Sequence, residues 1–180
     1  GAAARAASGA GFEATSNLEA GRRYGVPTTG TAAHAFTLLY DSEREAFTAQ
    51  VESLGKGTTL LVDTYDVRAA VDLAIEIAGP ELGAVRLDSG DLLIQAKEVR
   101  AQLDAAGNAS TRIIVTSDLD EHAIAALEAG PGSGYGVGTS LVTGSGAPTA
   151  PLGPTPGQGQ DRAGRRGGRA GRAGSERPRR

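Results

Sequence analysis

From residue 58 onward, the chain alternates short β-rich runs with amphipathic helical stretches. Val67, Val71 and Ile75 recur at helical spacing, for example, and that pattern stops at Gly79-Pro80. Strands are predicted at 58–62, 84–87, 113–116 and 135–138, with helices at 67–78, 92–107 and from about 121 to 130. Parallel strands need a crossover connection, which is usually a helix. The order therefore predicts an α/β fold with a parallel sheet or barrel.

The flanks of this alternating region have a different character. Upstream, Ser16-Asn-Leu-Glu19 has the pattern of a helix-capping box, and a long helical region is predicted between His34 and Leu54-Gly55. Downstream of Pro148 the periodicity disappears. Residues 151–180 carry eight Arg, eight Gly and only two acidic residues, too little apolar surface to offset the entropy of ordering. We expect a folded domain at 1–149 and a disordered Pro/Gly/Arg-rich tail at 150–180.

Composition excludes several kinds of protein. The chain has no Cys, which excludes disulfides and thiolate metal sites. No apolar run approaches the roughly 18 residues of a membrane helix, and the Ala-rich start, which lacks Met, indicates a piece of something longer. The net charge is −3 overall and +6 in residues 151–180, so residues 1–150 carry −9. An acidic body argues against nucleic-acid and membrane partners.

Polar residues gather where each predicted strand ends. In a parallel β/α fold these ends lie on one face, where such folds place their sites. Arg86-Leu-Asp-Ser-Gly-Asp91 combines a guanidinium, two carboxylates and a hydroxyl, which suit a sugar phosphate or a hydrated Mg²⁺. Gly136-Val-Gly-Thr139 is typical of a backbone cradle for phosphate. The strand-end residues are Asp63, Asp66, Arg86, Asp88, Ser89, Asp91, Ser117, Asp118, Gly136, Gly138 and Thr139.

Each of these residues also has a plain structural interpretation. Asp at a strand–helix junction is often only a helix N-cap, which alone would explain Asp66, Asp88 and Asp118. A Gly-x-Gly turn is common, and a single His, such as His34 or His122, is usually structural. The combination of four such loops on one face is what favours a binding site.

Several motifs together resemble the nicotinate phosphoribosyltransferase family. The resemblance covers roughly residues 1–149, and Ser16-Asn17 ahead of Tyr24-Gly-Val-Pro27 also looks like a segment of that family. In order along the chain, the motifs are Gly30-Thr-Ala-Ala-His34, Leu60-Leu-Val-Asp-Thr-Tyr-Asp66, Arg86-Leu-Asp-Ser-Gly-Asp91, Ser117-Asp-Leu-Asp-Glu121 and Gly136-Val-Gly-Thr139.

The resemblance implies a fold and an activity. The fold would be a partial, irregular β/α barrel of the type II phosphoribosyltransferases, usually dimeric and cytoplasmic. The reaction would convert nicotinate and 5-phosphoribosyl 1-diphosphate to nicotinate mononucleotide and diphosphate, an entry step of NAD synthesis. ATP would be a co-substrate that transiently phosphorylates a histidine, and Mg²⁺ would accompany the diphosphate.

The resemblance also implies roles for individual residues. His34 would accept the phosphoryl group, and Asp63 would hold one nitrogen of its ring. Arg86 would contact nicotinate and phosphate, and Asp88 the ribose hydroxyls. The remaining expected substrate-binding residues are Ser16, Asn17, Thr31, Ser89 and Asp91, and the expected 5′-phosphate cradle is Gly136, Gly138 and Thr139. No residue is assigned as a dedicated metal ligand.

The sequence departs from the family at both ends, since the family's amino-terminal domain is missing and the chain after Thr149 is unlike it. We interpret the tail as read out of frame; an arginine-glycine RNA-binding tail is disfavoured because it lacks aromatic residues. Four strands cannot close an eight-stranded barrel, so we expect the chain as written to be poorly stable and inactive. The alternatives are a nicotinamide-specific relative, disfavoured by Leu87, and a non-catalytic phosphate-binding remnant.

Overall fold

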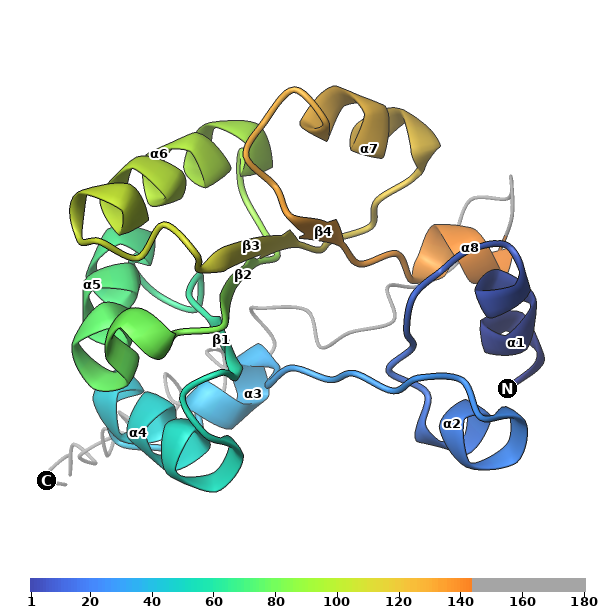
Figure 1. The fold of residues 1–180 in the computed structure, drawn as a ribbon, viewed down its shortest axis with the longest axis horizontal. Coiled ribbons are helices and arrows are strands. Elements are labelled where there is room, and N and C mark those ends of the chain that lie inside the picture. The colour runs from blue at the N-terminus through green and yellow to red at the C-terminus, as the bar shows by residue number, and fades with distance from the viewer. Residues whose placement is uncertain (144–180) are drawn as a thin grey trace, which may run out of the picture. The chain divides into compact units, whose positions relative to one another are not determined.

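The computed structural model describes residues 1–143, and the predicted tail at 150–180 lies outside them. Its helices and strands alternate from β1 onward, as Figure 1 shows. In chain order the elements are α1 (Ala2–Gly9), α2 (Leu18–Tyr24), α3 (His34–Thr37), α4 (Glu43–Leu54), β1 (Thr59–Leu61), α5 (Val67–Ala78), the 3₁₀ helix η1 (Gly79–Glu81), β2 (Ala84–Leu87), α6 (Leu92–Ala105), β3 (Arg112–Val115), α7 (Glu121–Leu127), β4 (Gly134–Tyr135) and α8 (Thr139–Thr143).

The four strands form one parallel sheet in the order β1-β2-β3-β4. Neighbours in the sheet are neighbours in the sequence, because each crossover helix returns the chain to the next position. The register pairs Leu60 with Val85, and Val85 with Ile113. All four carboxyl ends therefore face the same edge, and the predicted α/β fold with parallel strands is confirmed.

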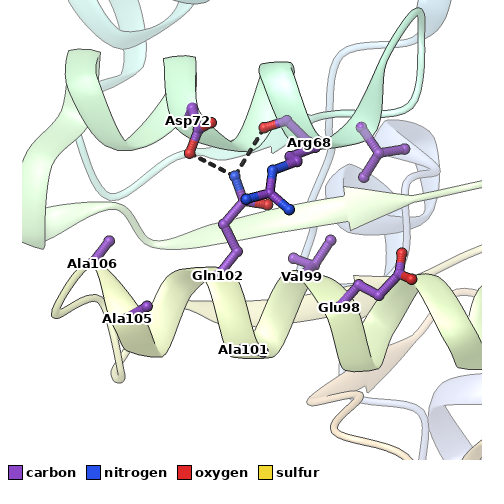
Figure 2. A pocket seen from close by; sticks show the side chains of 9 residues that line it. Arg68, Asp72, Glu98, Val99, Ala101, Gln102, Ala105 and Ala106 are labelled. Atoms are coloured by element: carbon purple, nitrogen blue, oxygen red, sulfur yellow. Dashed lines mark hydrogen bonds between the residues drawn. The ribbon is translucent and has the colours of Figure 1, made fainter.

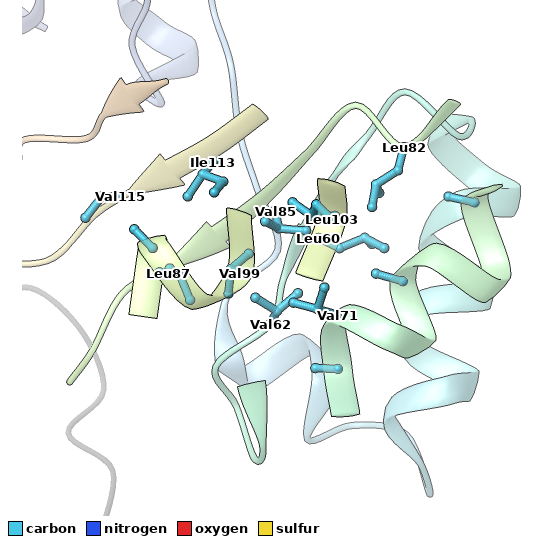
Figure 3. Packing of buried hydrophobic residues seen from close by; sticks show 14 of the residues in the cluster. Leu60, Val62, Val71, Leu82, Val85, Leu87, Val99, Leu103, Ile113 and Val115 are labelled. Carbon is cyan, nitrogen blue, oxygen red and sulfur yellow. The ribbon is translucent and has the colours of Figure 1, made fainter. Parts of the chain in front are cut away.

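A hydrophobic core joins the sheet to its crossover helices (Figure 3). Leu60, Val85 and Ile113 are fully buried in the strands, and Val71 and Leu103 pack against them from α5 and α6. Apolar burial of this kind stabilises a fold by about 25 cal/mol per Å² removed from water. The core therefore holds the strand ends in fixed relative positions.

An aspartate caps the N-terminus of each of the helices α5, α6 and α7, but only one of the three is an aspartate for which the sequence suggested a capping role. Asp66 caps α5 by accepting from the N–H of Ala69, as the capping interpretation predicts. Asp91 caps α6 and Asp120 caps α7. The capping interpretation does not hold for Asp88 and Asp118, since the N-caps of α6 and α7 are Asp91 and Asp120, three and two residues further along.

Two other predictions of secondary structure need correction. The long helix expected from His34 to Leu54 is two helices, because Ser42 accepts from the N–H of Glu45 and starts α4 afresh. The last strand is β4 rather than 135–138: its ladder ends where the N–H of Gly136 donates to the carbonyl of Val115. Among residues 1–143, no helix has the length and apolar character needed to span a membrane.

Candidate active site

The segment at residues 28–34 meets the carboxyl ends of β1 and β2. His34 begins α3, and its ring Nδ1 lies 3.1 Å from the hydroxyl of Thr64, which follows β1. The Arg86 guanidinium, at the third position of β2, reaches the hydroxyl of Thr31 at 2.5 Å. These contacts join positions 30 and 55 residues apart, so the site is assembled by the fold and not by sequence neighbours.

Two carboxylates face the other nitrogen of the His34 ring. Nε2 is 3.9 Å from Oδ1 of Asp63 and 3.8 Å from Oδ2 of Asp88. Both separations exceed a hydrogen bond, so the contact is electrostatic. The imidazole is 29% exposed, which leaves it accessible to a ligand while it stays next to two acidic groups.

Asp63 is the buried member of this pair, with 2% of its side chain exposed. Its Oδ2 accepts from the backbone N–H of Asp88 at 2.7 Å and from the hydroxyl of Ser89 at 2.8 Å. Its Oδ1 is buried and has no hydrogen-bond partner within the described part of the chain. A buried, unpaired carboxylate oxygen is costly, and the ring of His34 lies 3.9 Å from it. Asp63 and His34, the pair expected from the sequence, thus lie next to each other, but farther apart than a hydrogen bond.

Arg86 ties three segments together. Its Nε donates to the hydroxyl of Thr116 at 2.7 Å, and its two terminal nitrogens donate to Asp88 at 2.8 Å and to Thr31. The backbone carbonyl of Ala32 accepts a longer bond of 3.4 Å. Because the fork is largely occupied, Arg86 fixes the site's geometry and keeps few donors for a ligand.

Asp88 lies between the positive charge of Arg86 and the ring of His34. Burial alone raises the pKa of Asp88, but hydrogen bonds from Thr116 and Arg86, together with the charge of Arg86 and His34, outweigh it and lower the pKa. The carboxyl is therefore ionised at neutral pH. An ionised Asp88 is suited to accept hydrogen bonds from hydroxyl groups or to face a cationic centre.

A pocket of about 420 Å³ opens beside Arg86. It brings together Ser16, Thr31 and Arg86 of the predicted substrate-binding set. Its lining is rich in hydroxyl groups and has one guanidinium, a combination that suits a small anionic or polar ligand. The complete lining is Ser16, Leu18, Thr28, Thr29, Gly30, Thr31 and Arg86.

Three other predicted residues have local partners. Asn17 caps α2 by accepting from the N–H of Ala20, and Asp91 caps α6. Ser89 donates to Asp63 and so supports the carboxylate beside His34. Each of these three side chains thus has a structural role, and the substrate contacts expected of Asn17, Ser89 and Asp91 stay predictions.

The Gly136–Thr139 segment connects to the site through Thr116. A Cβ built on Gly136 would lie 2.5 Å from the methyl group of Thr116, so only glycine fits there without a shift. Gly138 has open space around it, and Thr139 is buried at the start of α8. The phosphate cradle assigned to Gly136, Gly138 and Thr139 stays a prediction.

Sequence reasoning predicted Thr31 but missed four other threonines of the site. Thr64 contacts His34, Thr116 donates to Asp88 and accepts from Arg86, and Thr28 and Thr29 line the pocket. Thr64 lies two residues after the predicted strand 58–62, and Thr116 is the last residue of the predicted strand 113–116, so their place at the strand ends was the available signal. Threonine is common in strands and turns, which is why the residue type alone does not stand out.

A larger hollow, of about 690 Å³, lies between α5 and α6 and away from the site (Figure 2). The Gln102 amide spans it, donating to the carbonyl of Arg68 at 2.9 Å and to Asp72 at 2.6 Å. It contains none of the predicted site residues, and it is a groove between two crossover helices. Within residues 1–143, no three His, Cys, Asp or Glu side chains cluster as a metal site would.

Comparison with known proteins identifies the family. No protein-family model matches the chain. The nicotinate phosphoribosyltransferases pncB1 and pncB2 of Mycobacterium tuberculosis are 62% and 50% identical to it, over 83% and 77% of this chain. Among solved structures, a nicotinate-nucleotide pyrophosphorylase from Pyrococcus furiosus superposes with a TM-score of 0.68 at 28% identity, covering 74% of this chain and 36% of that one.

The match is limited to part of each relative. The chain spans 35% of the length of pncB1 and 31% of pncB2. Over that part, the sequence identity and the fold agree on the same family. The chain therefore belongs to the nicotinate phosphoribosyltransferase family and corresponds to about a third of its curated members' length.

Proposed function

We propose that the chain carries the reaction centre of a nicotinate phosphoribosyltransferase. In this proposal nicotinate and 5-phosphoribosyl 1-diphosphate yield nicotinate mononucleotide and diphosphate, and ATP hydrolysis drives the reaction through a phosphohistidine at His34. The observation that carries it is the imidazole of His34 with Nε2 facing two carboxylates, 3.9 and 3.8 Å away, at the ends of parallel strands.

The transfer step needs negative charge beside the sugar. As the bond from the anomeric carbon to diphosphate breaks, positive charge builds on the ribose, and preorganised carboxylates stabilise it. Asp88 is the candidate, because its pKa is lowered and Arg86 and Thr116 fix its orientation. In its ionised form it also accepts hydrogen bonds from the ribose hydroxyls.

The pocket beside Arg86 is the candidate site for the pyridine ring and its carboxylate. The one Nη proton of Arg86 that has no acceptor among the described residues, together with the hydroxyls of Thr31 and Ser16, can bind a carboxylate. The segment with Gly136, Gly138 and Thr139 is the candidate cradle for the 5′-phosphate. A volume of about 420 Å³ accommodates the base with room for part of the sugar.

Phosphoryl transfer from ATP explains why a histidine sits among acids. A neutral imidazole nitrogen is the nucleophile, and a carboxylate on the far side of the ring stabilises the charge that develops. The donor set fits Mg²⁺ only in part: Asp63 and Asp88 offer carboxylate oxygens, but no third ligand joins them among the described residues. Mg²⁺ would thus be shared with the phosphates of a substrate and would neutralise their charge.

The cellular setting follows from the same proposal. Phosphoribosyl diphosphate and ATP are cytoplasmic metabolites, so we place the protein in the cytoplasm, and as a homodimer in its full-length form. The four-stranded sheet leaves β1 and β4 as edges within the described part of the chain. We accordingly expect turnover by the polypeptide as written to be much weaker than that of its relatives.

Labelling with γ-³²P ATP tests the proposal. The chain contains two histidines, so His34→Gln and His122→Gln form a matched pair. Acid-labile, base-stable label that His34→Gln abolishes and His122→Gln retains is the expected result. Label at His122 or at neither residue contradicts the proposal, and binding of nicotinate mononucleotide without label favours the phosphate-binding remnant.

Product analysis separates the two enzyme alternatives. The same preparation is supplied with phosphoribosyl diphosphate, ATP and either nicotinate or nicotinamide. Whatever weak turnover the chain supports should give nicotinate mononucleotide alone, while preferential use of nicotinamide would assign the chain to the nicotinamide-specific relative.

A further inference from the structure

The two carboxylate oxygens of Asp88 have different surroundings. Oδ1 accepts from the Arg86 guanidinium at 2.8 Å and also from the hydroxyl of Thr116, which follows β3. Oδ2 accepts no hydrogen bond within residues 1–143, and it is the oxygen that lies 3.8 Å from the His34 ring. The fold therefore holds one oxygen of Asp88, while the other faces the site.

The Thr116 hydroxyl has a single proton, and its neighbours determine where that proton lies. Nε of Arg86 donates to the hydroxyl oxygen at 2.7 Å, so this oxygen is an acceptor on that side. Its own proton can go to Oδ1 of Asp88 or to the carbonyl of Leu87, 3.3 Å away. That carbonyl already accepts from the backbone N–H of Thr116 at 2.8 Å. An ionised acceptor makes the stronger bond, so the hydroxyl donates to Asp88.

Arg86 and Thr116 consequently close a ring of hydrogen bonds on one oxygen. One terminal nitrogen of the guanidinium donates to Oδ1 of Asp88 directly, and Nε reaches the same oxygen through the Thr116 hydroxyl. The terminal torsion of an aspartate is broad when nothing restrains it. With two donors on Oδ1, the carboxylate cannot rotate without losing both bonds, so the direction of Oδ2 is set.

Gly136 limits the orientation of Thr116 from the side of β4. A Cβ built on Gly136 would lie 2.5 Å from the Thr116 methyl group but 3.5 Å from its Cβ, so the conflict concerns the methyl alone. The methyl and the hydroxyl are attached to the same carbon, and the torsion of that branched side chain is stiff. Displacing the methyl would therefore also turn the hydroxyl away from Arg86 and Asp88.

We propose that Thr116 is a positioning residue that holds Oδ1 of Asp88 together with Arg86 and so directs Oδ2 towards the substrate. In the same proposal, position 136 is glycine because Thr116 needs the space to take this orientation. This role requires no phosphate at Gly136. The part that concerns the substrate rests on the proposed function, whereas the part that concerns the hydrogen bonds and Gly136 does not.

Carbon-13 NMR of the Asp88 carboxyl carbon during a pH titration tests the hydrogen bonds without any activity. The full chain is used, and Asp88→Asn assigns the signal. Thr116→Val keeps the shape and removes the hydroxyl, so the pKa of Asp88 should rise, because its charged form loses a hydrogen bond. Thr116→Ser keeps the hydroxyl and should keep the pKa of Asp88 near its wild-type position.

The comparison of these two variants separates positioning from packing. Arg86 and His34 are present in both, so their charges act on Asp88 in each case. An Asp88 pKa that is unchanged in Thr116→Val contradicts the proposal. If Thr116→Val fails to fold, the wild-type chain decides: a nuclear Overhauser effect between the Nε–H of Arg86 and the methyl of Thr116 is expected. Its absence, with the sheet signals intact, overturns the inference.

A double-mutant cycle tests the part played by Gly136. Gly136→Ala in the wild-type background should raise the pKa of Asp88 as Thr116→Val does. In the Thr116→Ser background the conflicting methyl is gone, so Gly136→Ala should leave the pKa of Asp88 nearly unchanged. Gly138→Ala, which meets open space, is the control in both backgrounds. Equal shifts from Gly136→Ala in the two backgrounds would overturn the role of Gly136.

Calorimetric titration with nicotinate mononucleotide tests the part that concerns the substrate. Thr116→Val should weaken binding by roughly two- to tenfold, the range expected for one lost hydrogen bond, and Thr116→Ser should bind almost as wild type. Equal weakening in both variants contradicts the role of the hydroxyl. No binding by the wild-type chain contradicts the proposed function, and the carboxyl titration then decides the role of Thr116 by itself.

Discussion

Residues 1–57 and residues 58–138 are built differently, although both contribute to the site. The second region has a parallel sheet whose strands and helices share one apolar core. In the first region, the buried apolar residues are few and mostly alanine, such as Ala20 and Ala46, with Phe47 the main exception. The amino-terminal segment is tied to the sheet at the site through polar contacts, chiefly those of Thr31 and His34.

The difference shows which region contributes which part of the site. The regular region fixes Asp63, Arg86 and Asp88 at strand ends, where the core holds them. The irregular region contributes the imidazole of His34 and most of the pocket's hydroxyl groups. We infer that core packing fixes the positions of the strand-end residues, whereas a few hydrogen bonds fix the position of the amino-terminal segment.

The largest expected effect comes from the core of the sheet. Leu60→Ala removes a fully buried side chain in β1 and should reduce the free energy of unfolding by about 2–5 kcal/mol. Leu39→Ala is the matched change in the amino-terminal region, where the side chain is 83% exposed, and should cost less than about 0.5 kcal/mol. Urea unfolding followed by circular dichroism measures both, and equal losses would contradict the comparison.

The next effect concerns the contact that joins the two regions. Arg86→Gln removes the bonds to Thr31 and leaves Asp88 without its guanidinium, so we expect a loss of about 1.5–3 kcal/mol. Amide hydrogen exchange should quicken in residues 28–34 more than in the strands. Arg112→Gln, at an exposed position in β3, is the control. Uniform exchange across both regions in Arg86→Gln would argue against this anchoring role.

A smaller effect is expected at the edge of the sheet. Gly136→Ala puts a Cβ 2.5 Å from the methyl of Thr116 and should displace the hydroxyl that bonds Asp88, costing about 1–2 kcal/mol. Gly138→Ala meets open space and should be nearly neutral. Thermal unfolding of the two variants gives the comparison, and a Gly138→Ala loss as large as that of Gly136→Ala would refute it.

The smallest effects are pH-dependent and of opposite sign in the two regions. The lowered pKa of Asp88 means that its contribution to stability is present above its ordinary pKa of 3.8 and is lost as pH falls towards the lowered value. Burial, and then the charge of Asp66, raises the pKa of Glu43, so folding is favoured below its ordinary pKa of 4.5 and this gain is lost as pH rises through the raised value.

Unfolding at several pH values distinguishes the two carboxyl groups. Asp88→Asn should lose stability at pH 7, with the difference from wild type shrinking in acid. Glu43→Gln should gain stability at pH 7, because it removes a buried charge whose Oε1 has no partner within the described residues. Changes of the same sign in both variants at pH 7 would be inconsistent with these assignments.

Sequence patterns predicted the regular region better than the irregular one. Hydrophobic periodicity and turn residues locate the ends of β2 and α5 nearly to the residue, because local propensity and burial favour the same structure there. The break between α3 and α4 was missed, since Ser42 as a helix start is a common residue with a weak signal. Arg86 and Asp88 were predicted together from one motif, and they are paired.

The contacts of His34 could not be derived from spacing alone. Its neighbours Thr64 and Asp63 are some thirty residues away, and only the fold brings them together. Asp91 illustrates the opposite case: a carboxylate within a promising motif caps a helix, as local chemistry allows. Residue type and position at a strand end predict the site, but partners within it are set by tertiary structure.

The central claim is that the imidazole of His34 lies against the loop that follows β1. The most direct test is the nuclear Overhauser effect between the ring protons of His34 and the methyl group of Thr64, recorded on chain in which His122→Gln leaves one histidine. Clear cross-peaks, absent in Thr64→Ser, which lacks that methyl, are the predicted result. A His34 ring with no cross-peak to residues 63–64, in a chain whose sheet signals are intact, would contradict it.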